Sequence, residues 1–230
     1  MERNADARIY LADQRGVTET SDYQISHLFN HDSYTVVESQ PFGPLRTLNE
    51  VTLRAGAVWS PIVTSPTTVL LLPITGGLEY RQKAESGFLE PGQAGSFFLR
   101  AGAVFELSNP YEKEFITFLH IELAASGQET ASAFRVVAFD SGESNLLQPL
   151  METDGRRGFL GRFAGRQEGT YAVETPGGNV FVFVLQGVFE VANRLLHSGD
   201  GLALHYSGIG HLEFEALSEN AILLLLDLGP

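Results

Sequence analysis

Short apolar segments separated by turn residues run along the whole chain. They are rich in β-branched and aromatic residues, and Gly, Pro, Asn or Ser bounds each of them. Stretches with a helical period of useful length are scarce. The 24 glycines and 10 prolines are spread between the apolar segments. This pattern predicts an all-β protein of many short strands joined by tight turns, with strands expected at 68–74, 95–101, 115–123, 179–191 and 221–228.

The apolar segments recur in the same order in both halves of the chain. "VLLLPITGGLEY" (69–80) lines up with "VFVFVLQGVFEV" (180–191), and both have a glycine at the bend. "FLEPGQAGSFFL" then resembles "LLHSGDGLALHY", and "ITFLHIEL" resembles "AILLLLDL". Three matched blocks predict a duplicated double-sheet jelly roll, that is, two tandem barrels. We expect the first domain at 1–124, a linker at 125–145 and the second domain at 146–230.

Composition narrows the classes of function. The chain has 230 residues and a formal charge of −13, which disfavours binding to nucleic acid or to an anionic membrane. It has no cysteine, so disulfides, thiolate metal sites and cysteine nucleophiles are excluded. The longest apolar run is too short to span a bilayer, and "MERNADARIY" is not an apolar leader. We therefore expect a cytoplasmic protein with no membrane and no nucleic-acid partner.

Several motifs, in order, resemble those of one known family. "QRG" (14–16), "SHLF" (26–29) and "FGPLRTLNE" (42–50) are similar to the N-terminal signature of the pirin-like bicupins, which belong to the cupin superfamily and are related to quercetinases. "LEYR", "PG" and "RAG" continue this pattern, and the C-terminal half is similar to the second cupin domain of the same group. The resemblance covers nearly the whole chain and implies two tandem cupin barrels.

The resemblance also implies a metal site, which this sequence does not reproduce. Active relatives hold one metal ion, usually iron, in the N-terminal cupin through three histidines and one glutamate. The matching positions here are Ile62, Thr64, Leu107 and Asn109. No histidine lies between His31 and His120, so no shift of the alignment restores an imidazole. We expect no metal cofactor and no catalytic residue, because isoleucine and leucine supply no donor atom.

The same positions suggest a pocket of another kind. Together with the single tryptophan they describe mostly apolar walls with two neutral polar groups, a composition typical of small-molecule sites and of filled cores alike. The candidate pocket residues are Trp59, Ile62, Thr64, Leu107 and Asn109.

Other polar residues leave alternatives open. His27 and His31 could form a metal pair or be structural, and His120 shares a strand face with Phe118 and Glu122, where a structural role is expected. In "HLEFEAL", period-2 alternation places three polar side chains on one face, as a cation site or a solvated face. The arginines near 156–166 could bind an anion or be solvated. These residues are His211, Glu213, Glu215, Arg156, Arg157, Arg162 and Arg166.

Three functions remain after this survey. The first is a regulatory bicupin that binds a small organic ligand in its N-terminal barrel or a protein partner on its surface. The second is a quercetin 2,3-dioxygenase-like oxidoreductase with atypical ligands, and the third is a structural interaction scaffold. A monomer is expected, because duplication places two barrels in one chain.

Overall fold

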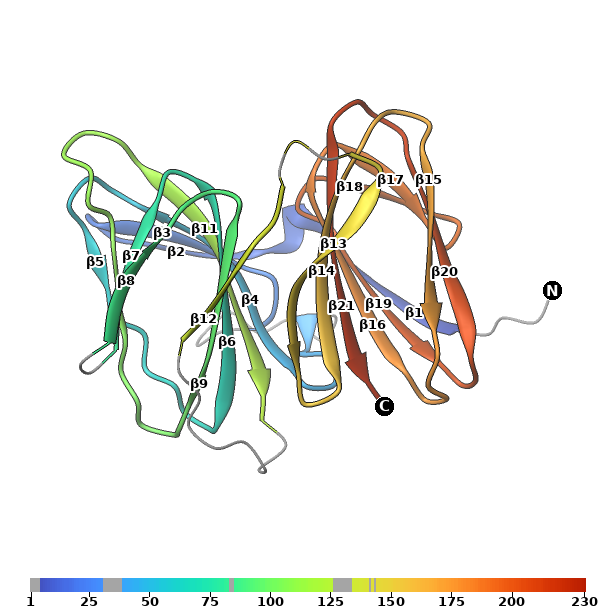
Figure 1. Ribbon diagram of the computed structural model, residues 1–230, viewed down its shortest axis with the longest axis horizontal. Coiled ribbons are helices and arrows are strands. Elements are labelled where there is room, and N and C mark those ends of the chain that lie inside the picture. The colour runs from blue at the N-terminus through green and yellow to red at the C-terminus, as the bar shows by residue number, and fades with distance from the viewer. Residues whose placement is uncertain (1–4, 31–38, 83–84, 126–133, 141, 143) are drawn as a thin grey trace. The chain divides into compact units, whose positions relative to one another are not determined.

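The computed structural model describes residues 5–30, 39–82, 85–125, 134–140, 142 and 144–230 (Figure 1). The named elements are strands, apart from one short 3₁₀ turn, η1 (Ala12–Gln14). None of the described helical segments has the length and apolar character needed to cross a membrane. The chain divides into two compact units, Arg15–Phe139 and Met1–Gln14 with Asp140–Pro230. We call them the first and the second barrel, and the expected all-β, two-barrel organisation is confirmed.

The first barrel is made of two antiparallel sheets. The larger sheet has seven strands in the order β12-β9-β6-β11-β4-β3-β2. The smaller has four in the order β5-β10-β7-β8. Their bounds are β2 Gly16–Glu19, β3 Tyr23–His27, β4 Leu45–Leu53, β5 Val58–Trp59, β6 Thr67–Thr75, β7 Leu78–Gln82, β8 Glu85–Leu89, β9 Gln93–Leu99, β10 Glu106–Ser108, β11 Ile116–Ala124 and β12 Arg135–Ala138.

The second barrel repeats this plan. Its larger sheet has six strands in the order β1-β19-β16-β21-β14-β13, and its smaller sheet has the order β15-β20-β17-β18. The bounds are β1 Ala5–Tyr10, β13 Leu146–Thr153, β14 Arg156–Phe163, β15 Glu168–Val173, β16 Asn179–Gln186, β17 Val188–Val191, β18 Arg194–His197, β19 Gly201–Tyr206, β20 Gly210–Ala216 and β21 Ala221–Gly229.

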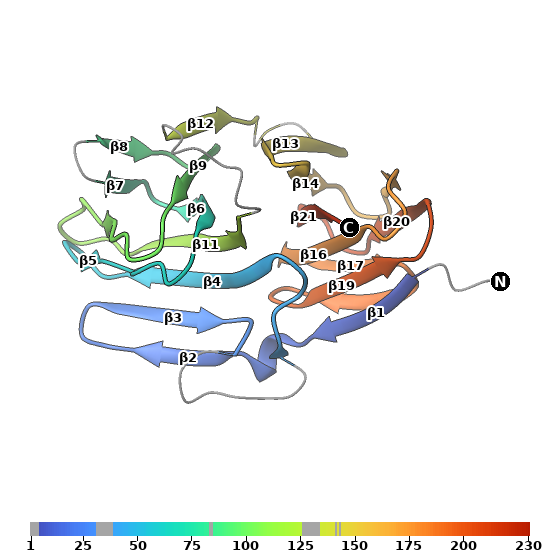
Figure 2. The same ribbon diagram turned by 90° about the horizontal axis from the view of Figure 1, so that it is seen from below.

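The edge strands place the unit boundaries elsewhere than the sequence suggested. β1 pairs with β19 along its full length, as Figure 2 shows, so the first 14 residues group with the second barrel and not with the first. β12 lies inside the expected linker of 125–145 but pairs with β9 and closes the edge of the first barrel. The expected domain of 1–124 therefore differs from the observed unit at both ends. Part of the expected linker, residues 126–133, lies outside the described residues.

The duplication is visible in the strand register. Val69 opposes Glu122 where β6 meets β11, and Val180 opposes Asp227 where β16 meets β21. The bend glycines also correspond, with φ of 72° at Gly76 and 82° at Gly187. A Cβ at Gly76 would lie 2.6 Å from the Cγ2 of Ile116, so both the backbone angle and the space require glycine there.

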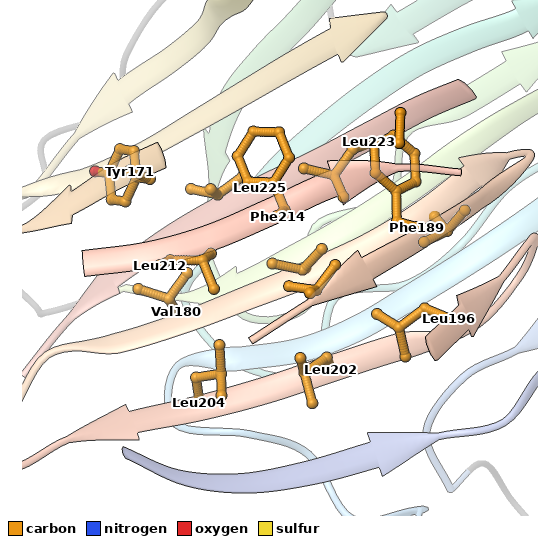
Figure 3. Close-up of a cluster of buried hydrophobic side chains, with 14 of the residues drawn as sticks. Tyr171, Val180, Phe189, Leu196, Leu202, Leu204, Leu212, Phe214, Leu223 and Leu225 are labelled. Atoms are coloured by element: carbon orange, nitrogen blue, oxygen red, sulfur yellow. The ribbon is translucent and has the colours of Figure 1, made fainter. Parts of the chain in front are cut away.

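Each barrel has its own apolar core. Alternate residues of the strands point inward and pack together. In the second barrel the core includes Val180, Leu202, Phe214, Leu223 and Leu225, which converge between the two sheets (Figure 3). The corresponding core of the first barrel contains Val51, Val69, Phe105, Leu107 and Phe118, among others.

Candidate functional site

Two of the five candidate pocket residues lie together. Leu107 on β10 stands directly opposite Trp59 on β5, and Leu107 is fully buried in the apolar core of the first barrel. Trp59 is half-buried and packs against the same core. The indole and the Leu107 side chain are therefore cross-strand neighbours in the small sheet of the first barrel.

Two further candidates point away from this core. Ile62 is 65% exposed and forms an isolated bridge with Val104, and Thr64 is exposed as well. Val63 between them is buried and belongs to the core. The strand alternation thus turns Ile62 and Thr64 outward and the intervening valine inward. The structure does not bring these two side chains to Leu107.

Asn109 serves the backbone. Its Nδ2 donates to the carbonyl oxygens of Leu53, Arg54 and Glu114 at 3.1, 3.0 and 2.8 Å. Its Oδ1 accepts from the amide of Tyr111 at 2.9 Å. The side chain is buried, and its amide group holds the end of β4 against the loop that follows β10. All of its polar atoms are thereby engaged.

These four positions do not fit a transition-metal ion. Such an ion needs several nitrogen, oxygen or sulfur donors that converge at about 2 Å. Ile62 and Leu107 offer no donor, Thr64 faces outward and the amide of Asn109 binds backbone groups. Elsewhere in the part of the chain that the structure describes, no three His, Cys, Asp or Glu side chains are grouped as metal ligands.

A row of polar residues crosses the large sheet of the first barrel. His27 on β3 opposes Asn49 on β4, and Asn49 opposes His120 on β11. His120 in turn opposes Leu71 of the core. Residues directly opposite one another share a sheet face, so the row lies on the face that carries the core. All three polar side chains are buried.

The first member of this row is well held. The Nδ1 of His27 lies 3.0 Å from the Oδ1 of Asn49, and its Nε2 lies 2.9 Å from the Oγ1 of Thr18. Both ring nitrogens therefore have partners, which gives His27 a structural role. His31, its proposed partner in a metal pair, lies outside the described residues.

His120 is in a different situation. It is 2% exposed, and among the described residues neither ring nitrogen makes a hydrogen bond of regular geometry. Its Nε2 lies 3.3 Å from the Oε1 of Glu122, two residues along the same strand face. Its ring packs edge-on against Trp59 at 5.1 Å between centroids and lies 5.9 Å from Phe105.

Glu122 carries the charge of this group. Burial alone would raise the pKa of its carboxyl, but the close imidazole of His120, together with the Thr47 hydroxyl, outweighs burial and holds the pKa below its ordinary value. The Oγ1 of Thr47 donates to Glu122 at 3.1 Å. The result is a carboxylate beside an imidazole, half-buried in the first barrel.

In the described part of the second barrel, the positions that correspond to Asn49 and His120 are apolar. There, Phe159 on β14 opposes Leu225 on β21, and Leu225 opposes Val182 on β16. The register that equates Glu122 with Asp227 also equates His120 with Leu225, which is fully buried in the second core. The sequence contained this signal, since the aligned blocks "ITFLHIEL" and "AILLLLDL" put His120 opposite Leu225. No sequence pattern indicated that Asn49 and Thr18 would contact the ring of His27.

The other candidate groups are solvated or paired. On β20, His211 and Glu213 are exposed while Leu212, Phe214 and Ala216 are buried, as the alternation predicted. Each arginine near 156–166 contacts a nearby oxygen, so the cluster is not an open anion site. These contacts join Arg156 to Asp154, Arg157 to Asp227 and Glu174, Arg162 to the carbonyl of Gly142 and to Ser144, and Arg166 to Glu215.

Comparison with known proteins identifies the domain type of the second barrel and the fold of the chain. Residues 157–228 match the family model of the quercetinase C-terminal cupin domain. YhhW from Escherichia coli is 16% identical, with 98% of each chain covered and a TM-score of 0.85. The second barrel contains a quercetinase C-terminal cupin domain, and the chain as a whole has the bicupin fold. Quercetin 2,3-dioxygenase from Acinetobacter baumannii is similar to this bicupin at 14% identity, with 96% of this chain and 85% of that chain covered and a TM-score of 0.70. At these identities the likeness establishes the fold. No curated protein sequence matches the chain significantly.

Proposed function

We propose that this bicupin acts without a transition metal in its first barrel, as a regulatory protein that binds a small organic molecule there. The proposal is supported by the residues that stand at the four positions expected to hold metal ligands. Two hold hydrocarbon side chains, one hydroxyl faces outward and the remaining amide is bound to three backbone carbonyls. A metal-dependent oxygenase has no support from such residues.

The alternative is a quercetinase-like dioxygenase with atypical ligands. A nickel(II) complex of the bacterial pirin YhhW has been solved; it is 15% identical, covers 98% of this chain and 100% of that chain, and has a TM-score of 0.85. Nickel binding belongs to YhhW, and quercetin oxidation to the Acinetobacter enzyme. Retention of fold does not transfer either property, because chemistry depends on the site and not on the scaffold.

Turnover separates the two functions. The purified chain is assayed for quercetin consumption with added iron(II), nickel(II), copper(II) and manganese(II), with the Acinetobacter quercetin 2,3-dioxygenase as the positive control. We expect no turnover above the protein-free metal solutions. Metal-dependent turnover that Thr64→Ala abolishes would instead assign the dioxygenase function to this chain.

A protein partner on the surface and a monomeric, cytoplasmic state stay predictions from the sequence. A filled barrel that no small molecule stabilises would favour the scaffold function, since a ligand that binds the folded state raises its unfolding temperature.

A further inference from the structure

We propose that the first barrel binds the hydroxyl group of a small neutral molecule at the imidazole of His120, rather than at the four positions where relatives hold a metal. This inference rests on the proposed function, because it names the chemistry of the molecule that the first barrel binds. The pocket expected from the sequence and this site share a single residue, Trp59.

The imidazole of His120 is buried without a regular hydrogen bond among the described residues. Buried polar groups in folded proteins nearly always have a hydrogen-bond partner, and those without one coincide with functional sites or with bound water. His120 is 2% exposed, and its Nδ1 has no partner among the described residues. Its Nε2 lies 3.3 Å from the Oε1 of Glu122. A polar molecule beside Nδ1 would supply the missing partner.

The second barrel has a leucine, Leu225, at the position that corresponds to His120. Folding alone does not require a histidine at this position, because the second barrel has the same strand register and places Leu225 there. Leu225 is fully buried in an apolar core, as Figure 3 shows. A leucine in the first barrel would avoid the cost of an unpartnered ring. Packing alone would therefore favour leucine over histidine at position 120.

Two aromatic side chains lie beside the imidazole of His120. Trp59 lies edge-on to the imidazole at 5.1 Å, and Phe105 lies at 5.9 Å. Aromatic walls of this kind favour an apolar or aromatic body on the bound molecule. Trp59 itself is only partly buried, so part of its side chain is accessible to solvent. Trp59 is also the only tryptophan, so its fluorescence reports on this location alone.

The groups around His120 restrict the charge of the bound molecule. Glu122 faces His120 from the same strand, and the neutral side chain of Asn49 faces it from β4. The carboxylate repels an anionic molecule. A neutral imidazole nitrogen accepts a hydrogen bond and a protonated one donates it, and a hydroxyl group can do either. A neutral hydroxyl compound with an apolar body meets all of these conditions.

Phenol, toluene and benzoate form a matched set of probes. Phenol has the hydroxyl group and the ring, toluene lacks the hydroxyl group, and benzoate adds a negative charge. Binding is measured by calorimetry, by Trp59 fluorescence and by the ¹⁵N chemical shifts of the His120 ring. We expect phenol to bind, to shift the Nδ1 signal, and to bind more tightly than toluene or benzoate.

The decisive variant is His120→Leu, which installs the residue of the second barrel. We expect phenol affinity to fall by about tenfold, the change that corresponds to loss of one hydrogen bond. His205→Leu, which removes an exposed ring in the second barrel, should leave phenol affinity unchanged. Equal phenol affinity in His120→Leu and the native chain would overturn the proposal, and so would an absence of phenol binding to the native chain.

The two proposals fail in different ways. If the native chain is free of metal but does not bind phenol, the assignment of His120 is wrong and metal-independent function still stands. If the native chain turns over quercetin with a bound metal, the proposed function is wrong whatever phenol does.

Discussion

His120 in the first barrel and Leu225 in the second occupy the same position in the repeated strand register. Both side chains are buried. His120 lies on β11, between β6 and β4, and Leu225 lies on β21, between β16 and β14. One barrel thus encloses a titratable ring where the other encloses hydrocarbon. This difference has a measurable consequence for stability.

Replacement of His120 by leucine should stabilise the first barrel. The substitution removes a buried ring without regular hydrogen bonds and adds apolar contact with Trp59 and Phe105. We expect the free energy of unfolding to rise by about 1 kcal/mol. The reverse change, Leu225→His, should lower it by about 3 kcal/mol because it buries an unpartnered ring in an apolar core. Urea unfolding followed by circular dichroism measures both, and a loss of stability in His120→Leu would show that the ring is structural.

Asn109→Asp should destabilise the first barrel strongly. A carboxylate cannot donate to the three carbonyl oxygens that now receive hydrogen bonds from Nδ2, and its charge is repelled by them. We expect a loss of about 3 kcal/mol. The neighbouring Ser108→Ala is the control, because Ser108 bonds only to the exposed Glu79 and should change stability by less than about 0.5 kcal/mol. Similar thermal midpoints for the two variants would contradict the structural role of Asn109.

Glu122→Gln tests the carboxylate beside His120 through pH. The folded-state pKa of Glu122 is held below the ordinary value of 4.5, so the unfolded chain binds more protons between the two pKa values. The contribution of Glu122 to stability is therefore fully present above about 4.5 and is lost as the pH falls through the folded-state pKa.

Unfolding free energies of the native chain and of Glu122→Gln, measured from pH 7 to pH 3, give the comparison. The native chain should be the more stable at pH 7, and the difference should shrink steadily below pH 4.5. A difference that stays constant over this range would mean that Glu122 is not stabilised as a carboxylate by its neighbours.

Tyr171→Phe should weaken the second barrel. The Tyr171 hydroxyl donates to the Oδ2 of Asp227 at 2.6 Å, and the Nη2 of Arg157 donates to the same oxygen at 2.9 Å. Burial and the bond to Asp227 raise the pKa of Tyr171, which shows that the neutral hydroxyl is favoured. We expect a loss of about 2 kcal/mol, because the acceptor is charged. Tyr206→Phe is the matched control, since its hydroxyl lies 3.4 Å from the carbonyl of His211, and its effect on the urea midpoint should be clearly smaller.

Strand content and duplication were predictable from the sequence because both depend on local patterns. The segments at 68–74 and 221–228 fall within β6 and β21, and the segment at 115–123 matches β11 except for its first residue. The aligned glycines Gly76 and Gly187 both adopt the positive φ that the repeat implied. Period-2 alternation also gave the buried and exposed faces of β20 correctly.

The edge strands were not predictable in the same way. β1 and β12 each add to a sheet whose next strand is distant in sequence, β19 and β9 respectively. Alternation within a short segment indicates a strand but does not say which edge it joins. The expected domain limits therefore missed the exchange of the first 14 residues to the second barrel.

The candidate site was predictable only as a set of replaced positions. The sequence identifies Ile62, Thr64, Leu107 and Asn109, but not which way each side chain points. In the structure one is in the core, two face outward and the amide of the fourth is bound to the backbone. The importance of His120 depends on missing hydrogen bonds, which only three-dimensional contacts reveal.

The metal content of the protein, purified without chelator or added metal, shows whether the first barrel holds a transition ion. Elemental analysis of the intact chain, repeated after dialysis against nickel(II) and removal of excess ion, gives the number of transition ions per molecule. We expect far less than one ion per chain in both samples. One tightly held ion per chain, lost in a Thr64→Ala variant that stays folded, would contradict this expectation.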